Sequence, residues 1–294
     1  MTGDSSLATV LRLPDGRAVS YRVYGRPGGR PVMCFHGTPG SHVKFAIADG
    51  AAASLGLALI AVDRWGYGDT DEPEDCSLSS YAADCARVAD QLGLGRFAVL
   101  GISGGGPYAA AVAAELKARI SASALVAPVG PIYGPGPRPT LDVMHRLSFG
   151  VLPKIPGAIG LAFAAFRQVA KRQPIWATRV AGGRSLAADR MILTDRTFTE
   201  ALGKSFAVGM VHDARGPVID MQLFSRAWGV DLATTRCPTQ LWIGDQDRNV
   251  PVSAVEALAD QIPNAVLTRL GPHGHYWIAR NHSQVLRWLA ETQQ

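Results

Sequence analysis

A serine enclosed by glycines, at the point where an apolar segment gives way to an alanine-rich one, constrains this sequence most. The stretch is "FAVLGISGGGPYAAAVAAEL", Phe97 to Leu116, and it places Gly101, Ser103 and Gly105 in a G-x-S-x-G pattern. A strand that turns sharply into a helix holds the serine in a strained conformation and crowds the residues two before and two after it, so only tiny side chains fit there. The pattern predicts a nucleophile elbow that exposes Ser103 at the end of a buried strand.

Two other interpretations of this glycine-rich turn stand beside the elbow. Gly104-x-Gly106-x-x-Ala109 matches a dinucleotide-binding fingerprint letter by letter. That fingerprint expects an acidic residue at the end of the following strand, whereas "SASALVAPVG" contains none, and no Gly-Lys-Ser/Thr follows for a phosphate-binding loop. A purely structural turn with an incidental serine holds only if no base and no acid lie elsewhere in the chain.

Short apolar runs alternate with helical stretches on both sides of the elbow. The helical stretches are clearest around Ser79 to Leu92 and Pro107 to Leu116, and the apolar runs are "ATVLRL", "AVSYRVYG", "PVMCFHG", "LALIAVDRWG", "FAVLGIS" and "ASALVAPVG". The first two runs indicate an antiparallel hairpin turned at Pro14-Asp15-Gly16, and the later ones indicate buried parallel strands. This alternation predicts an α/β fold with a doubly wound, mostly parallel sheet and helices on both faces.

The residue pattern of the sequence changes after residue 130. "PIYGPGPRPT" indicates a Pro/Gly linker, and about a hundred residues of helical character follow it. Strand signals resume at "PTQLWIGDQD" and "AVLTRLGPHGH", each with a helix after it, which brings the predicted sheet to eight strands. The 294 residues are enough for one large domain with an insertion. We therefore expect a core made of 1–130 and 231–294, and an inserted helical cap at 131–230.

A serine hydroxyl needs an imidazole to take its proton and a carboxylate to orient that imidazole. Both residue types follow the predicted cap. Asp245 and Asp247 stand at the end of one strand, and His273 and His275 stand after the last. The chain order serine, aspartate, histidine differs from the orders of chymotrypsin-like and subtilisin-like proteases.

These motifs together resemble the α/β-hydrolase superfamily, in its serine-nucleophile branch with a helical cap, and the resemblance covers nearly all of the chain outside the cap. The residues that carry it are "HGTPG", "DRWGYGDTD", "GISGG", "GDQDRNVP" and "GHYWI". The resemblance implies that Asp247 is the orienting carboxylate and His275 the base. It also implies that the backbone N–H groups of Thr38 and Gly104 form the oxyanion hole.

The reaction expected from this resemblance is acyl transfer to water. Ser103 attacks an acyl carbon of a small ester, lactone or related substrate, and water then hydrolyses the acyl-enzyme. Two alternatives stay open: carbon–carbon bond hydrolysis, cyclisation or acyl transfer on the same triad, and a ligand-sensing protein on a hydrolase scaffold. No metal or organic cofactor is implied. The expected partner is the acyl substrate, with no nucleic acid and no membrane insertion, and the oligomeric state is left open.

Several other residues are expected to be structural. Asp63 is expected to cap the turn that follows it, and Trp65 and Tyr67 to pack near the rim of the site. The remaining histidines and the cysteines show no metal-ligand spacing, and the cysteines are expected to be reduced thiols: His42, His145, His212, His282, Cys34, Cys76, Cys85 and Cys237.

The predicted cap is basic, with thirteen Lys or Arg and six Asp or Glu in 131–230, while the whole chain has a net charge of +5. Such a field can attract an anionic substrate. Alternatively, and in our preferred interpretation, Lys171, Arg172 and Arg179 solvate the outer faces of helices. Their apolar faces would then cover a hydrophobic acyl pocket, with Ile159, Leu161, Phe163 and Phe166.

The start of the sequence has no basic flank leading into a long apolar run, so neither a signal peptide nor an anchor is predicted and a cytoplasmic location is expected. The segment "FGVLPKIPGAIGLAFAAF" is interrupted by Pro153, Lys154 and Pro156, and is expected not to span a membrane.

Overall fold

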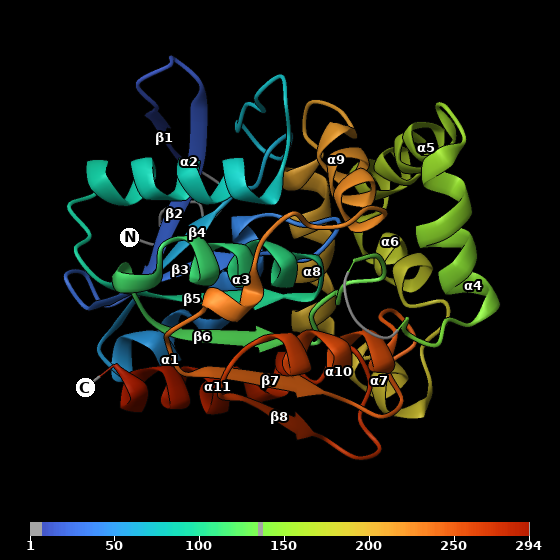
Figure 1. The fold of residues 1–294 in the computed structure, drawn as a ribbon. Coiled ribbons are helices and arrows are strands. Elements are labelled where there is room, and N and C mark those ends of the chain that lie inside the picture. Colours follow the sequence, from blue (N-terminus) through green and yellow to red (C-terminus); the bar gives the residue numbers. More distant parts are fainter. Residues whose placement is uncertain (1–7, 135–137, 294) are drawn as a thin grey trace.

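An eight-stranded sheet forms the centre of the computed structural model, which describes residues 8–134 and 138–293 (Figure 1). The strands lie side by side in the order β1-β2-β4-β3-β5-β6-β7-β8. Strand β2 is antiparallel to β1 and to β4, and all the other pairs are parallel. The strands are β1 Thr9–Arg12, β2 Ala18–Gly25, β3 Arg30–Phe35, β4 Leu57–Val62, β5 Phe97–Ile102, β6 Ile120–Val126, β7 Thr239–Ile243 and β8 Ala265–Arg269. The predicted fold class is therefore confirmed.

Two of the inner strands, β4 and β5, are buried along their whole length. Every residue of β4 and β5 is buried, as expected for strands covered by helices on both faces. The predicted hairpin joins β1 to β2, with Thr9 opposite Tyr21, and Gly16 in its turn has a φ of +89° that suits glycine. The apolar runs of the sequence thus mark the strands correctly.

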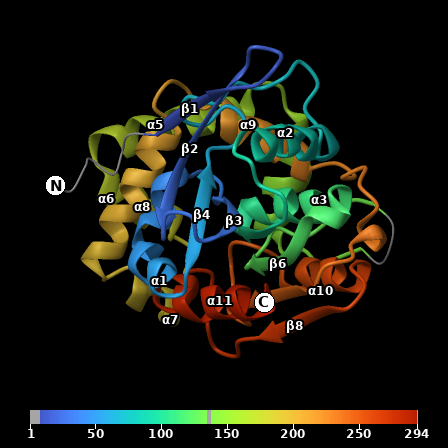
Figure 2. The same cartoon turned by 90° about the vertical axis from the view of Figure 1, so that its left-hand side faces the viewer.

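Helices cover the sheet in two layers, which Figures 1 and 2 show from two sides. Helices α2 (Leu78–Gln91), α3 (Gly106–Glu115) and α10 (Val252–Gln261) share one hydrophobic cluster with one face of the sheet. On the other face, α1 (Asp49–Ser54) and α11 (Ile278–Thr292) share a second cluster, together with the 3₁₀ turn η1 (His42–Ala48). The sheet is therefore the middle of three layers, as a doubly wound fold requires.

Helices fill the connection between β6 and β7, and in Figure 1 they gather beyond the tips of the strand arrows. They are α4 Val143–His145, η4 Arg146–Val151, η5 Leu152–Lys154, α5 Ala158–Arg172, α6 Pro174–Ala181, α7 Ala187–Ile192, α8 Arg196–Gly209 and α9 Arg215–Phe224, and the turn η6 Leu232–Thr234 follows. No strand interrupts the described part of this connection. Residues 135–137 of the predicted linker lie outside the described residues. The domain boundaries at 130 and 231 stay a prediction.

Two of these helices pack tightly on loops of the core. A Cβ on Gly209, at the end of α8, would meet the carbonyl oxygen of Gly40, and a Cβ on Gly216 of α9 would lie 2.5 Å from the ring of Tyr67. A third hydrophobic cluster joins α5, α6, α7 and α8 to Tyr276 and to Ala279 of the last helix, α11. The helical connection is therefore seated directly over the ends of the strands.

Residues 8–134 and 138–293 contain no single helix that is long and apolar enough to cross a bilayer. One pair of helical segments, Val143–Lys154 and Ala158–Arg172, meets the length and composition criteria when taken together, but it is bent by 112°. The same residues contain no group of three or more His, Cys, Asp or Glu side chains arranged to hold a metal ion. The four cysteines are free thiols.

Candidate active site

The turn after β5 has the geometry of a strained elbow. Ser103 has a φ of +55°, a conformation that is costly for a residue with a side chain. A Cβ on Gly101 would lie 2.6 Å from the carbonyl oxygen of Gly105, and one on Gly105 would collide with the carbonyl oxygen of Phe35. The backbone approaches both flanking glycines too closely for a larger side chain, as the G-x-S-x-G pattern predicts.

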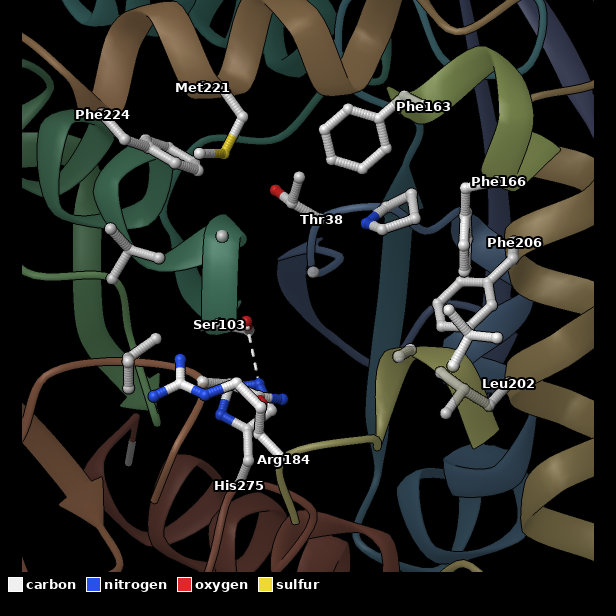
Figure 3. Close-up of a pocket in the computed structure, with 18 of the residues that line it drawn as sticks. Thr38, Ser103, Phe163, Phe166, Arg184, Leu202, Phe206, Met221, Phe224 and His275 are labelled. Carbon is white, nitrogen blue, oxygen red and sulfur yellow. Dashed lines mark hydrogen bonds between the residues drawn. The ribbon is translucent and has the colours of Figure 1, made fainter. Parts of the chain in front are cut away.

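The elbow brings Ser103 to one of the two predicted histidines. Its Oγ lies 3.0 Å from Nε2 of His275 (Figure 3). Nδ1 of the same ring lies 2.8 Å from Oδ2 of Asp247. Both Asp247 and His275 are buried. By contrast, Asp245 is exposed and paired with Arg269, and His273 is exposed on its loop. From the pairs Asp245/Asp247 and His273/His275, the structure therefore brings Asp247 and His275 to the serine.

Backbone donors fix the carboxylate that faces the imidazole. Oδ1 of Asp247 accepts hydrogen bonds from the N–H groups of Asn249 and Val250, at 2.8 and 3.0 Å. The other oxygen, Oδ2, is left for Nδ1 of His275. This arrangement holds one imidazole tautomer, with the proton on Nδ1 and a free lone pair on Nε2 directed at the serine.

A second buried carboxylate, Asp189 on α7, holds the backbone of the histidine loop. Its two oxygens accept from the N–H groups of His275 and Tyr276, at 2.8 and 2.9 Å. Burial raises the pKa of Asp189, while the two backbone donors act to lower it. No local motif in the sequence marks Asp189, because this carboxylate binds the backbone of a residue 86 positions away.

Thr38 lies against Gly104 on the other side of the serine. A Cβ on Gly104 would stand 3.1 Å from the backbone nitrogen of Thr38, so the two predicted oxyanion donors are neighbours. The hydroxyl of Thr38 donates to Asp220 of α9. That carboxylate also accepts from Arg64 and from the hydroxyls of Tyr67 and Tyr108. Asp220 therefore ties the helical connection to the loop that carries Thr38.

The serine opens into a cavity of about 320 Å³. Figure 3 shows Phe163, Phe166, Phe206 and Phe224 around the open space next to Ser103. The lining is mainly apolar, and its apolar side chains include Val129, Phe149, Phe163, Phe166, Val180, Leu202, Phe206, Met221, Phe224 and Val250. Such a lining suits a small, largely apolar ligand whose polar group is held near the serine.

Two cationic side chains, Arg184 and Lys44, also line this cavity. Arg184, in the loop between α6 and α7, is ion-paired with Asp142. Lys44 comes from η1. Neither was identified from the sequence, since the basic residues named there, Lys171, Arg172 and Arg179, are exposed.

Several expected positions need correction. Leu161 does not cover the cavity, since it is 75% exposed. Asp63 does not cap the turn after it, because its carboxylate accepts from the backbone and ring of His42 and from the hydroxyl of Ser20. Trp65 and Tyr67 are fully buried and lie inside the core, not at a rim.

A family model described as the alpha/beta hydrolase fold matches residues 30–278, which include the elbow, both predicted oxyanion residues and both partners of the serine. The chain belongs to the α/β-hydrolase family. The resemblance inferred from the motifs is therefore confirmed.

Relatives of this chain carry different activities in their names. It is 34% identical to a non-heme chloroperoxidase from Streptomyces lividans over 120 residues, 40% of this chain and 44% of that protein. It is 35% identical to a proline iminopeptidase from Lactobacillus delbrueckii subsp. lactis over 105 residues, 33% and 36% of the two chains. The matches thus span less than half of the length of these relatives.

A similar solved structure is an alpha/beta hydrolase fold protein from Nakamurella multipartita, with a TM-score of 0.71, 24% identity and coverage of 98% and 99% of the two chains. At this level of identity, the likeness establishes only the fold of this chain.

Proposed function

We propose that this protein is a serine hydrolase that cleaves a small ester, lactone or related acyl substrate through an acyl-enzyme. The observation that carries the proposal is the hydrogen-bonded series Ser103 Oγ, His275 Nε2 and Nδ1, Asp247 Oδ2, with spacings of 3.0 and 2.8 Å, at the edge of an apolar cavity. A nucleophile, a base and an orienting acid within hydrogen-bond reach are the requirements of nucleophilic acyl transfer.

In the first half of the reaction, Ser103 Oγ attacks the acyl carbon while Nε2 of His275 takes the hydroxyl proton. Asp247 stabilises the imidazolium that forms. The developing oxyanion accepts hydrogen bonds from the backbone N–H groups of Thr38 and Gly104. The imidazolium then gives its proton to the leaving alcohol, and the ester bond breaks.

In the second half, His275 takes a proton from a water molecule, which attacks the acyl-enzyme on the same carbonyl. The oxyanion again lies at Thr38 and Gly104, and its collapse returns the proton to Ser103 and releases the acid. The aromatic side chains around the cavity support an apolar acyl or alcohol group on the substrate. In this proposal the helical segment 131–230 acts as the lid over the reacting bond.

The cavity lining also bears on the kind of substrate. It contains Lys44 and Arg184 but no Asp or Glu side chain among the described residues. A substrate with a free amino terminus would meet two cations and no carboxylate. The lining therefore favours neutral or anionic acyl substrates over a peptidase activity like the one that names a relative.

A labelling and turnover experiment tests the proposal. A fluorophosphonate probe should label the wild-type enzyme at Ser103, and 4-nitrophenyl butyrate should be hydrolysed with steady turnover. Ser103→Ala should lose both signals and keep its circular dichroism spectrum, because the elbow depends on the glycines and not on the hydroxyl.

The alternatives give different results in the same experiment. Labelling without steady turnover favours a ligand-sensing protein. Labelling with turnover of only activated carbon–carbon substrates, or peracid formation in the presence of peroxide, favours the alternative chemistries of this triad. Ester turnover that survives in Ser103→Ala would rule out the acyl-enzyme mechanism. Cytoplasmic location and the absence of a nucleic-acid partner remain predictions from the sequence.

A further inference from the structure

Lys44 brings an ammonium group close to the nucleophile. The side chain reaches from η1 into the wall of the cavity that contains Ser103. The position that a Cβ on Gly37 would occupy lies 3.6 Å from Nζ of Lys44 and 3.3 Å from Cβ of Ser103. The ammonium of Lys44 and the side chain of Ser103 therefore lie on either side of one small space, next to Gly37 in the loop that carries Thr38.

Within the described residues, the side-chain ammonium of Lys44 has no hydrogen bond and no ion pair, while the backbone N–H of Lys44 donates to the carbonyl oxygen of Ser41. Burial and the nearby positive charge of Arg64 lower the pKa of Lys44 to about 8. The other two cations near the cavity are paired, Arg64 with Asp220 and Arg184 with Asp142. Lys44 is thus a part-buried charge, and the described residues supply no counter-ion for it.

The described residues that line the two cavities beside Lys44 include no Asp or Glu. The core loops present Arg64, His36 and His275, and His282 of α11 lines a second, apolar cavity together with Lys44. Helix α8 contributes apolar residues such as Phe206 to the cavity that Lys44 lines. An unpaired ammonium in such surroundings destabilises the folded protein unless a bound ligand neutralises it.

We propose that Lys44 binds a carboxylate carried by the acyl substrate, so that the hydrolase prefers anionic esters to neutral ones. This inference rests on the proposed function of the same site. A carboxylate of a bound substrate would make a charge-assisted hydrogen bond with Nζ while the ester carbonyl lies at Ser103. Arg184 is not assigned this role because Asp142 already neutralises it.

Matched substrates test the proposal. One pair is mono-4-nitrophenyl adipate and its methyl ester, which place the charge on the acyl side. The other pair is 4-carboxyphenyl pentanoate and its methyl ester, which place the charge on the leaving group. We expect wild-type kcat/KM to favour the charged member of at least one pair about tenfold or more, and Lys44→Met to abolish that ratio. Lys44→Arg should restore part of it.

The control is Lys117→Met, which removes the same charge from the 3₁₀ turn η3 (Lys117–Arg119) at the opposite end of the sheet. It should keep the wild-type ratio. The proposal is overturned if wild-type enzyme shows no preference in either pair, or if Lys44→Met lowers kcat/KM of charged and neutral esters by the same factor. The preference should also decline as the pH rises through the region above 8, where Lys44 loses its proton.

A binding measurement separates this inference from the proposed function. Titration calorimetry of adipate and of dimethyl adipate into Ser103→Ala protein needs no turnover. Tighter binding of adipate that is lost in the Ser103→Ala, Lys44→Met double variant supports the anion site even if no ester is hydrolysed. Equal binding of the two compounds contradicts the anion site even if neutral esters are hydrolysed well.

Discussion

At the scale of single residues, two neighbouring aspartates are expected to differ sharply in their effect on rate. Asp247→Asn presents an amide donor to Nδ1 of His275 and favours the wrong tautomer, so kcat/KM should fall by about 10³- to 10⁴-fold. Asp245→Asn breaks only an exposed ion pair with Arg269 and should change kcat/KM less than about threefold. Steady-state kinetics of both variants with 4-nitrophenyl butyrate check the ranking, and the reverse order would reject Asp247 as the orienting acid.

The candidate-site residues that the sequence indicated are those marked by local geometry. Ser103 is marked by glycines that the turn itself requires, and Asp247 and His275 follow strands whose ends meet at one edge of the sheet. Asp189 and Asp220 were missed because they act across 86 and 182 residues of chain and have no neighbouring motif. A buried acid in a helical segment is visible in the sequence only as one polar residue among many.

At the scale of elements, α7 is expected to control the histidine loop through Asp189. Asp189→Asn places an amide NH₂ against one of the two backbone N–H groups that the carboxylate now accepts, which displaces His275. We expect kcat and the rate of fluorophosphonate labelling to fall by about 10²-fold with a near-native circular dichroism spectrum.

Asp195→Asn is the matched control for this prediction. Asp195 is also an aspartate in the helical connection that accepts from a backbone N–H group, but this group belongs to Phe198, and Asp195 caps α8. Asparagine is nearly as good a cap as aspartate, so labelling should stay close to wild type. Equal slowing in the two variants would mean that Asp189 acts only through general stability.

Periodicity explains which elements the sequence predicted well and where it erred. The strands were found because helices cover both faces of the sheet and turn each strand into a continuous apolar run. On α5, Ile159, Phe163 and Phe166 are spaced by four and three residues and share a face, whereas Leu161 falls between these turns and faces solvent. Hydrophobicity alone selected Leu161, and helical spacing excludes it.

At the scale of the whole molecule, charge is distributed unevenly between surface and site. The basic surplus of the helical connection includes exposed side chains such as Lys171, Arg172 and Arg179, which water solvates at little cost. Lys44 is different because its charge is part-buried beside Ser103 and has no ion-pair partner among the described residues. If it serves to bind substrate, it should weaken the folded protein when no substrate is bound.

The destabilisation of the folded protein by Lys44 depends on pH. The pKa of Lys44 is about 8 in the folded protein, against a reference value of 10.5. Between these values the unfolded chain binds more protons than the folded one, so the contribution of Lys44 to the free energy of unfolding rises with pH. Below pH 8 the full penalty applies, and above 10.5 it is absent.

Lys44→Met should therefore stabilise the free enzyme at pH 7, by about 1–3 kcal/mol after allowance for solvent screening. The gain should shrink as the pH is raised from 8 toward 10.5, whereas Lys117→Met should change stability little at either end of this range. Urea unfolding of the three proteins at pH 7 and pH 9.5 measures the difference, because other titrating groups cancel between variants. A loss of stability in Lys44→Met at pH 7 would mean that the protein itself neutralises Lys44, which would leave no unpaired charge for a substrate carboxylate.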